Sequence, residues 1–341
     1  MQPRESCTDF KIMKTTTPLS RRDLLGLLLA VGAGSLHQTA AAQSGKPLTL
    51  IVPVPPGGGM DSTARLAADQ LRETFGPVIV DNRPGAALRI ALNLVKAAAP
   101  DGHTLLFTSI SPFTIYPFVY TRLGYKVEGD LIPVAPVVSY EFAIAVPGSS
   151  PIRSLAEYIA AVKKAPEVHG LYAVPAAGSA VHFAGAAFAA MAGLSMKHVP
   201  YKGSAPAMQD LIGGHVPACV NVLGEFLPYR ADGKVRVLAT TGAKRSPFMA
   251  DVPTLAELGF KGLVASEQFG LFAPAATAAS VVDKLNAAMA GAMGKPEIGK
   301  RLGELGYTPA QASPAAFAAA LREQRAYWGP IVKATGFTLD E

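Results

Sequence analysis

Residues 51–61, IVPVPPGGGMD, are the stretch from which the fold can be argued. They comprise a short apolar run, two prolines, three glycines and an aspartate that can cap a helix. A glycine turn between a strand and a helix N-terminus presents unpaired backbone N–H groups and the positive end of the helix dipole, which both favour a bound anion. The stretch therefore predicts either a ligand-binding turn or an ordinary strand-to-helix connection.

The chain around this stretch alternates between strand and helix patterns. Apolar runs of strand length at residues 48–52, 78–80 and 104–108 alternate with helical patterns at 61–75 and 89–98. Alternation of this kind predicts a mostly parallel sheet with helices on both faces.

Ligands of such sheets bind at the carboxyl ends of the strands. This rule places residues 55–59 and 109–111 in the predicted site.

A second alternating series begins after the apolar run at residues 134–146, which we expect to cross between two domains. In this series a strand at 171–174 is followed by the small residues 176–179 and a helix that runs to Met191. This arrangement repeats the strand, turn and helix of residues 51–61. The remaining expected elements are strands at 196–200, 218–222, 235–240 and 268–273, and helices at 155–164, 205–212, 225–232, 281–293, 297–305 and 315–334.

The N-terminus has the features of an export signal. Residues 20–25, SRRDLL, form a twin-arginine signature, and an apolar segment at 26–36 and the small residues Ala40–Ala42 follow. We predict a twin-arginine signal at residues 1–42, cleaved near Ala42–Gln43, and hence a periplasmic protein. An uncleaved anchor is the alternative, and either Met1 or Met13 can be the true start.

The charge and the cysteines exclude several classes of function. The chain has 31 basic and 25 acidic residues, a formal charge of +6, and no basic run, so nothing indicates a nucleic-acid partner. Cys7 belongs to the predicted signal, which leaves Cys219 alone and allows no intramolecular disulfide. The apolar neighbours of Cys219 predict a buried small side chain rather than a nucleophile.

Motifs for catalysis, cofactors and metals are absent from the sequence. It has no GxSxG elbow, no lysine of a phosphate loop, no HExxH and no paired cysteines, so we predict no enzyme activity, no cofactor and no metal. The histidines are dispersed, and each is more readily structural than a ligand. His182 is the exception, because it lies one turn into the helix that follows residues 176–179. Asp61 has two interpretations, a helix cap or a ligand contact.

Ordered blocks along the chain resemble the Bug family, the periplasmic solute receptors of tripartite tricarboxylate transporters. The resemblance covers essentially the whole mature chain. The blocks that carry it are VPVPPGGGMDSTAR from Val52, DNRPGA from Asp81, APDGHTLL from Ala99, HVPYKGSAPAMQDLIGG from His198, ATTGAKRSP from Ala239, DVPTLAELG from Asp251 and FGLFAPA from Phe269.

This resemblance implies an α/β fold of the two-domain periplasmic-binding-protein type II, in which two crossing strands form a hinge. The domains would be 43–143 plus 267–341, and 144–266. It also implies a monomer that closes on a small organic carboxylate and delivers it to a membrane permease. The expected ligand-binding residues are Pro55, Pro56, Gly57, Gly58, Gly59, Asp61, Ser109, Ala177, Gly178, Ser179, His182 and Asn221.

The sequence departs from the family pattern at several of these positions. Met60 replaces a common threonine or serine, Leu88 and Arg89 replace a glycine-asparagine pair, and Asn221 replaces an aspartate. Losing that aspartate removes an acidic partner for an amino group, so we expect a carboxylate without an α-amine. Two other functions stay open: a ligand-dependent sensor that contacts a signalling receptor, and a periplasmic enzyme that uses His182 with Asp61.

Overall fold

The computed structural model describes residues 45–340, and the predicted twin-arginine signal lies outside the described residues. From Pro47 onward the chain forms one compact unit. Within residues 45–340, no helix combines the length and the apolar character needed to cross a bilayer.

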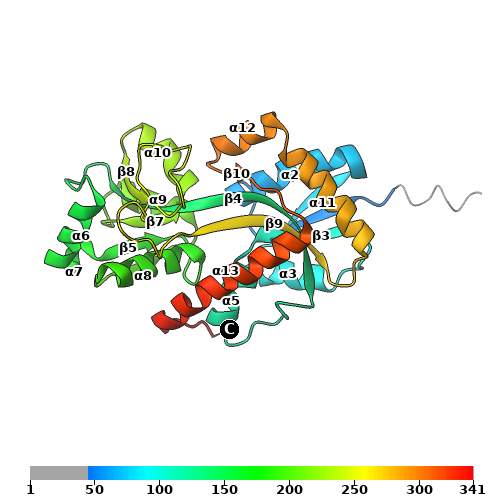
Figure 1. The fold of residues 1–341 in the computed structure, drawn as a ribbon, viewed down its shortest axis with the longest axis horizontal. Helices are drawn as coiled ribbons and strands as arrows, with labels where there is room; N and C mark the ends of the chain where they lie inside the picture. The colour runs from blue at the N-terminus through cyan, green and yellow to red at the C-terminus, as the bar shows by residue number, and fades with distance from the viewer. Residues whose placement is uncertain (1–44, 341) are drawn as a thin grey trace, which may run out of the picture. The chain divides into compact units, whose positions relative to one another are not determined.

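A single mixed sheet forms the centre of this unit (Figure 1). The strand order is β2-β1-β3-β9-β4-β7-β5-β6, and β8 and β10 also pair with β4. The strands are β1 (Leu48–Val52), β2 (Val78–Asn82), β3 (Thr104–Ser109), β4 (Leu131–Pro147), β5 (Leu171–Val174), β6 (Lys197–Pro200), β7 (Cys219–Val222), β8 (Val235–Thr240), β9 (Ser266–Pro274) and β10 (Thr308–Pro309).

Two groups of strands can be distinguished within this sheet. In the first strand group, β1 pairs parallel with β2 and β3, and β9 pairs antiparallel with β3. In the second strand group, β5 pairs parallel with β6 and β7. The mixed α/β fold predicted from the alternating pattern is confirmed, whereas the domain boundaries stay a prediction.

Strand β4 connects the two strand groups. Its residues up to Glu141 pair antiparallel with β9, and those from Phe142 onward pair antiparallel with β7 and β8. Figure 1 shows β4 and β9 side by side, one leaving the first strand group and the other returning to it. The register between them shifts beside Pro133 and Pro136, because proline has no N–H to donate to a ladder.

Helices cover this sheet, and the long ones lie close to their predicted bounds. The C-terminal helix α13 contacts β4 and also α8 in the second strand group. The helices are α2 (Gly59–Phe75), α3 (Arg89–Lys96), α4 (Ser111–Thr114), α5 (Tyr116–Val119), α6 (Leu155–Lys164), α7 (Pro166–His169), α8 (Ala180–Ala192), α9 (Ser204–Ile212), the 3₁₀ helix η1 (Leu223–Phe226), α10 (Leu227–Ala231), α11 (Ala279–Met293), α12 (Pro296–Glu304) and α13 (Pro314–Thr335).

The prediction of one continuous helix at residues 225–232 is wrong. The chain there makes η1 and then a new short helix, α10, which has Pro228 in its first turn. A proline suits a first turn because no intrahelical acceptor exists there for the N–H that it lacks.

Two helices begin at serine N-caps. Ser313 accepts the N–H of Ala316 at 3.2 Å in α13, and Ser154 accepts the N–H of Glu157 at 3.2 Å in α6. In a capping box the Glu157 carboxylate would accept the N–H of Ser154, but here it accepts the N–H of the preceding residue, Arg153, at 2.6 Å.

The hydrophobic core extends over both strand groups. Its main cluster includes Leu50 and Phe107 from the first strand group, Phe188 from α8 and Trp328 from α13. Cys219 is fully buried, and burial raises the pKa of its thiol to about 12. The prediction that Cys219 is a buried small side chain is therefore confirmed.

Candidate functional site

The first glycine turn connects the end of β1 to the start of α2. Residues 55–58 are exposed and Gly59 is half-buried. Gly57 has φ of +97°, a conformation that favours glycine over other residues. The N-cap of α2 is Gly58, so the prediction that Asp61 is the N-cap is wrong, and Asp61 is the third residue of the helix.

Asp61, in the first turn of α2, instead fixes the conformation of the glycine turn by accepting hydrogen bonds. Its side chain is buried, and one carboxylate oxygen, Oδ2, accepts the Gly57 N–H and the Arg65 Nε–H, each at 2.9 Å. The other oxygen accepts from Asn82 Nδ2 at 2.9 Å. Burial alone would raise the pKa of Asp61, but the donors on Arg65, Gly57 and Asn82 outweigh burial and lower it. Asp61 is therefore ionised and fully engaged within the protein.

Gly59 lies directly against a tyrosine from a distant part of the chain. A Cβ at Gly59 would come within 2.2 Å of the Tyr307 hydroxyl, so a larger residue is excluded unless Tyr307 moves. Tyr307 is buried, and its ring lies 5.5 Å from that of Tyr140 and 5.6 Å from that of Phe269. The first turn thus packs against Tyr307, which itself contacts aromatic side chains of β4 and β9.

The second glycine turn connects β5 to α8 and has the same plan. Gly178 has φ of +74°, and its N–H donates to Nδ1 of His182 at 3.2 Å. Ser179 is the N-cap of α8, and its hydroxyl donates to the Ala176 carbonyl at 2.7 Å. Here too, a side chain four residues beyond the glycine accepts the glycine N–H.

His182 is held in a neutral state by its surroundings. Its ring is buried, 3.9 Å from that of His198 and 4.8 Å from that of Phe337. Burial, with a smaller contribution from His198, lowers the pKa of His182 to about 4. Because Nδ1 accepts a hydrogen bond in the neutral ring, the proton is on Nε2.

The end of the chain packs against this second turn. A Cβ at Gly178 would lie 3.2 Å from Leu339 and 3.3 Å from Val119 of α5. Leu339 donates its N–H to the Val119 carbonyl at 2.8 Å. The C-terminal segment thus links the second turn to α5, which the sequence pattern did not predict.

Ser109 at the end of β3 belongs to a buried network around Glu267 of β9. Glu267 accepts the Ser111 N–H at 3.1 Å and the hydroxyls of Ser109, Ser111 and Tyr140. Burial raises the pKa of Glu267, and these donors offset only part of that effect. Sequence reasoning missed Glu267, although a single acid beside the apolar run at 269–275 was an available signal.

Asn221 of β7 is fully buried and only partly satisfied. Its Oδ1 accepts the Val222 N–H at 2.8 Å and the Ser204 hydroxyl at 3.2 Å. Its Nδ2 has no acceptor among the described residues. An unpaired buried donor of this kind is unfavourable unless a ligand or water accepts from it.

The predicted site residues form two sets at the carboxyl ends of parallel strands. Because β1 and β3 are parallel neighbours, residues 55–59 and Ser109 lie at the same edge of the first strand group. The parallel pairing of β5 and β7 likewise puts residues 177–179 and Asn221 at one edge of the second strand group. That the two sets face each other across a ligand stays a prediction.

The other departures from the family pattern have structural roles. Met60 is half-buried and packs against the main core. Leu88 adopts φ of +73°, which is unusual for a residue with a branched side chain. The Arg89 guanidinium lies 4.3 Å from the centre of the Tyr120 ring and donates to the Ala86 carbonyl.

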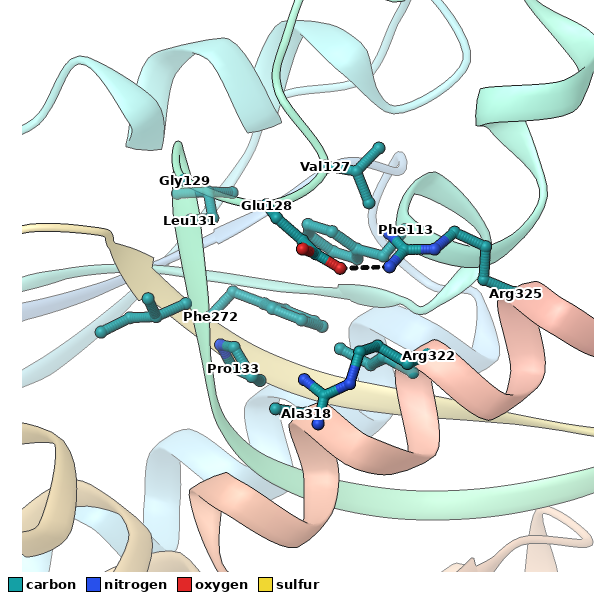
Figure 2. Close-up of a pocket in the computed structure, with 12 residues that line it drawn as sticks. Phe113, Val127, Glu128, Gly129, Leu131, Pro133, Phe272, Ala318, Arg322 and Arg325 are labelled. Carbon is teal, nitrogen blue, oxygen red and sulfur yellow. Dashed lines mark hydrogen bonds and ion pairs between the residues drawn. The ribbon is translucent and has the colours of Figure 1, made fainter.

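A cavity of about 210 Å³ lies away from both turns, between α13 and the chain that leads into β4 (Figure 2). Phe113 and Phe272, whose rings stack 4.2 Å apart, line it. Arg325, ion-paired with Glu128, and Arg322 lie at the same cavity. None of the predicted site residues lines it, so it is separate from the candidate site.

The chain is similar to known binding proteins along most of its length. The model of the tripartite tricarboxylate transporter family receptor matches residues 63–337. BugT of Bordetella pertussis is 33% identical over 319 residues, which are 93% of this chain and 97% of BugT.

Solved structures share this fold. The R. palustris protein Rpa4515 with adipate has a TM-score of 0.79 and 32% identity, covering 86% of this chain and 98% of that one. MatC from Rhodopseudomonas palustris with bound malate has a TM-score of 0.75 and 28% identity, covering 84% of this chain and 98% of that one.

Proposed function

The chain belongs to the tripartite tricarboxylate transporter receptor family of periplasmic solute-binding proteins, and we propose that its two glycine turns together bind a small organic carboxylate. As a receptor it serves transport, and the proposed role is binding rather than catalysis. Rpa4515 with adipate and MatC with malate support a carboxylate as the ligand class.

The observation that carries this proposal is a set of free backbone donors at the two turns. Gly57 and Gly178 donate internally, but the N–H groups of Gly58, Gly59 and Ser179 have no acceptor among residues 45–340. Gly58 is exposed, and the other two residues are half-buried. Such donors at the N-termini of α2 and α8 stabilise a carboxylate without an arginine.

Asn221 limits the range of carboxylates that the proposed site can bind. Its unpaired Nδ2–H group can donate to a carboxylate or hydroxyl oxygen, but it has no lone pair for an ammonium group. We therefore propose a dicarboxylate or hydroxycarboxylate that lacks an α-amine.

Calorimetry on the mature chain, residues 43–341, tests this ligand class. Adipate, malate, benzoate, aspartate and glutamate would be titrated under the same conditions. We expect binding of adipate or malate and at least about tenfold weaker binding of the amino acids, since the Asn221 Oδ1 already accepts from Val222 and Ser204 and leaves the ammonium group no acceptor on this side chain. Tight binding of aspartate or glutamate alone would contradict the proposal.

Delivery to a permease and export complete the proposed function. We propose that domains 43–143 plus 267–341 and 144–266 close on the ligand about β4 and β9, and that a membrane permease recognises the closed form. Export would use the twin-arginine signal. Replacing both Arg21 and Arg22 by lysine in the precursor should therefore keep the protein out of the periplasm, as cell fractionation would measure.

A further inference from the structure

A cavity of about 640 Å³ is lined by His182, whose Nδ1 accepts the Gly178 N–H of the second glycine turn, but not by Gly178 itself. Helix α8, strands β5 and β6 and the C-terminal end of α13 enclose it. The volume falls within the roughly 300–1,000 Å³ of small-molecule sites. Tyr327 of α13 donates to the Gly262 carbonyl at 3.3 Å and so joins α13 to the loop that closes one side.

The walls of this cavity are apolar and carry no charged side chain. No lysine, arginine, aspartate or glutamate is among its lining residues. The apolar walls include Ala187, Leu194, Met196, Leu263, Ile331 and Phe337. An anion would have to give up its hydration here without any opposite charge, which is strongly unfavourable.

Two imidazoles, those of His182 and His198, line the cavity. The Tyr172 and Thr335 hydroxyls already donate to the carbonyls of His182 and Val332, at 3.4 and 2.7 Å. In contrast, Nε2–H of the buried His182 has no acceptor among the described residues, and neither ring nitrogen of His198 has a partner there. The cavity thus offers imidazole N–H donors within an apolar enclosure.

The cavity also has an apolar mouth. Met191 of α8 lines it and is 47% exposed, and its neighbour Ala190 is exposed as well. Methionine is flexible and polarisable, so it can adapt to guests of different shape.

We propose that this cavity is a second binding site, and that it takes a neutral, largely aromatic molecule with a carbonyl or ether oxygen that accepts from His182 or His198. Apolar area provides the affinity, and the imidazole N–H groups orient the acceptor. The site is distinct in chemistry from the carboxylate site and goes beyond the proposed function, so its failure would leave the carboxylate proposal untouched.

A matched pair of probes tests the proposal on the mature chain. The neutral probe is 2-acetylnaphthalene, and 2-naphthoate is its anionic counterpart of nearly the same shape. Calorimetry should show saturable binding of 2-acetylnaphthalene at one molecule per chain, and the ring proton NMR signals of His182 and His198 should shift with it. Absence of saturable binding, or unchanged histidine signals, would overturn the proposal.

Variants with a larger side chain in the cavity test whether 2-acetylnaphthalene binds there. Ala186→Phe places a ring from α8 into the cavity and should weaken 2-acetylnaphthalene binding at least about tenfold, because the ring occupies volume that the probe needs. Ala160→Phe on the exposed face of α6 is the matched control and should bind like the original chain. If Ala186→Phe does not fold, Ala190→Phe at the exposed mouth replaces it.

Two outcomes of these titrations would contradict the proposal that this cavity is a binding site. One is 2-acetylnaphthalene binding that survives both cavity variants unchanged. The other is 2-naphthoate binding that is as tight as that of the ketone and equally sensitive to Ala186→Phe, because a site without cations should reject the anion.

Discussion

The two glycine turns have the same backbone arrangement but use different side chains to accept the glycine N–H. In each, a glycine at positive φ donates its N–H to a side chain four residues later, which leaves the following N–H groups free. The first turn uses a carboxylate, Asp61, held by Arg65 and Asn82. The second turn uses the neutral ring of His182, held by aromatic packing. The first turn is therefore fixed by charge and the second by burial.

The largest effect should come from removing the acceptor of the first turn. Asp61→Ala leaves the Gly57 N–H and Asn82 Nδ2–H without their acceptor, and we expect unfolding free energy to fall by about 2–3 kcal/mol. Adipate or malate affinity should fall more than about tenfold, because the turn loses its fixed shape. Urea unfolding and calorimetry measure the two effects.

Asp69→Ala is the matched control for this variant. Asp69 lies on the same helix, is exposed and pairs with Arg72, which is exposed as well, so its loss should change stability by less than about 1 kcal/mol. Equal effects of the two substitutions on ligand affinity would show that Asp61 does not shape the site.

Removing the acceptor of the second turn should have a smaller effect. His182→Leu keeps an apolar side chain among the aromatic rings but loses a neutral hydrogen bond, so we expect a loss of about 1–2 kcal/mol. Ligand affinity should fall about fivefold by the same measurements, with His215→Leu on the surface as control. A loss equal to that of Asp61→Ala would remove the distinction between a charged and a neutral acceptor.

The contributions of His182 and Asp61 to stability should also depend differently on pH. The pKa of folded His182, about 4, lies below the ordinary 6.5, so stability is present above pH 6.5 and is lost as pH falls toward 4. By pH 5.5 the loss should be about 1 kcal/mol. Asp61, whose pKa is lowered from 3.8, should contribute no change in this range.

Urea unfolding at pH 7.5, 6.5 and 5.5 measures this difference. The stability of His182→Leu should fall less over this range than that of the original chain. If the unfolding free energies of the two proteins changed equally with pH, protonation of His182 would not be a cause of the loss of stability.

The smallest effect should come from the exposed partner of Asp61. The Arg65 side chain is half exposed, and water competes for its ion pair with Asp61, so Arg65→Ala should change ligand affinity by at most about twofold. Arg72→Ala on the same helix, with similar exposure, is the control. A tenfold loss in Arg65→Ala alone would assign this arginine a direct contact with the ligand.

The sequence predicted the strand and helix order well because the relevant signals are local. The apolar run before the glycines forms β1, and α13 begins within one residue of the start expected at residue 315. The crossing role of β4 also followed from its length and its prolines. Each of these features depends on residues that are close together in the chain.

What the sequence did not predict depends on contacts between distant residues. Glu267 meets Ser109 and Ser111 only after β9 pairs with β3. The packing of Leu339 against Gly178 likewise depends on where α13 ends. The N-cap was placed three residues too late, at Asp61 instead of Gly58, because glycines can also begin a helix and the first residue of a helix is predicted less reliably than the helix itself.

A crystal structure of the mature chain with its tightest-binding carboxylate tests the central claim most directly. We predict one carboxylate group about 3 Å from the N–H of Gly58 or Gly59, and contacts from residues 177–179 at the other side of the ligand. The Asn221 amide should donate to a ligand oxygen or to a bridging water. A ligand bound elsewhere, for example beside Arg322, with both glycine turns empty, would contradict the account.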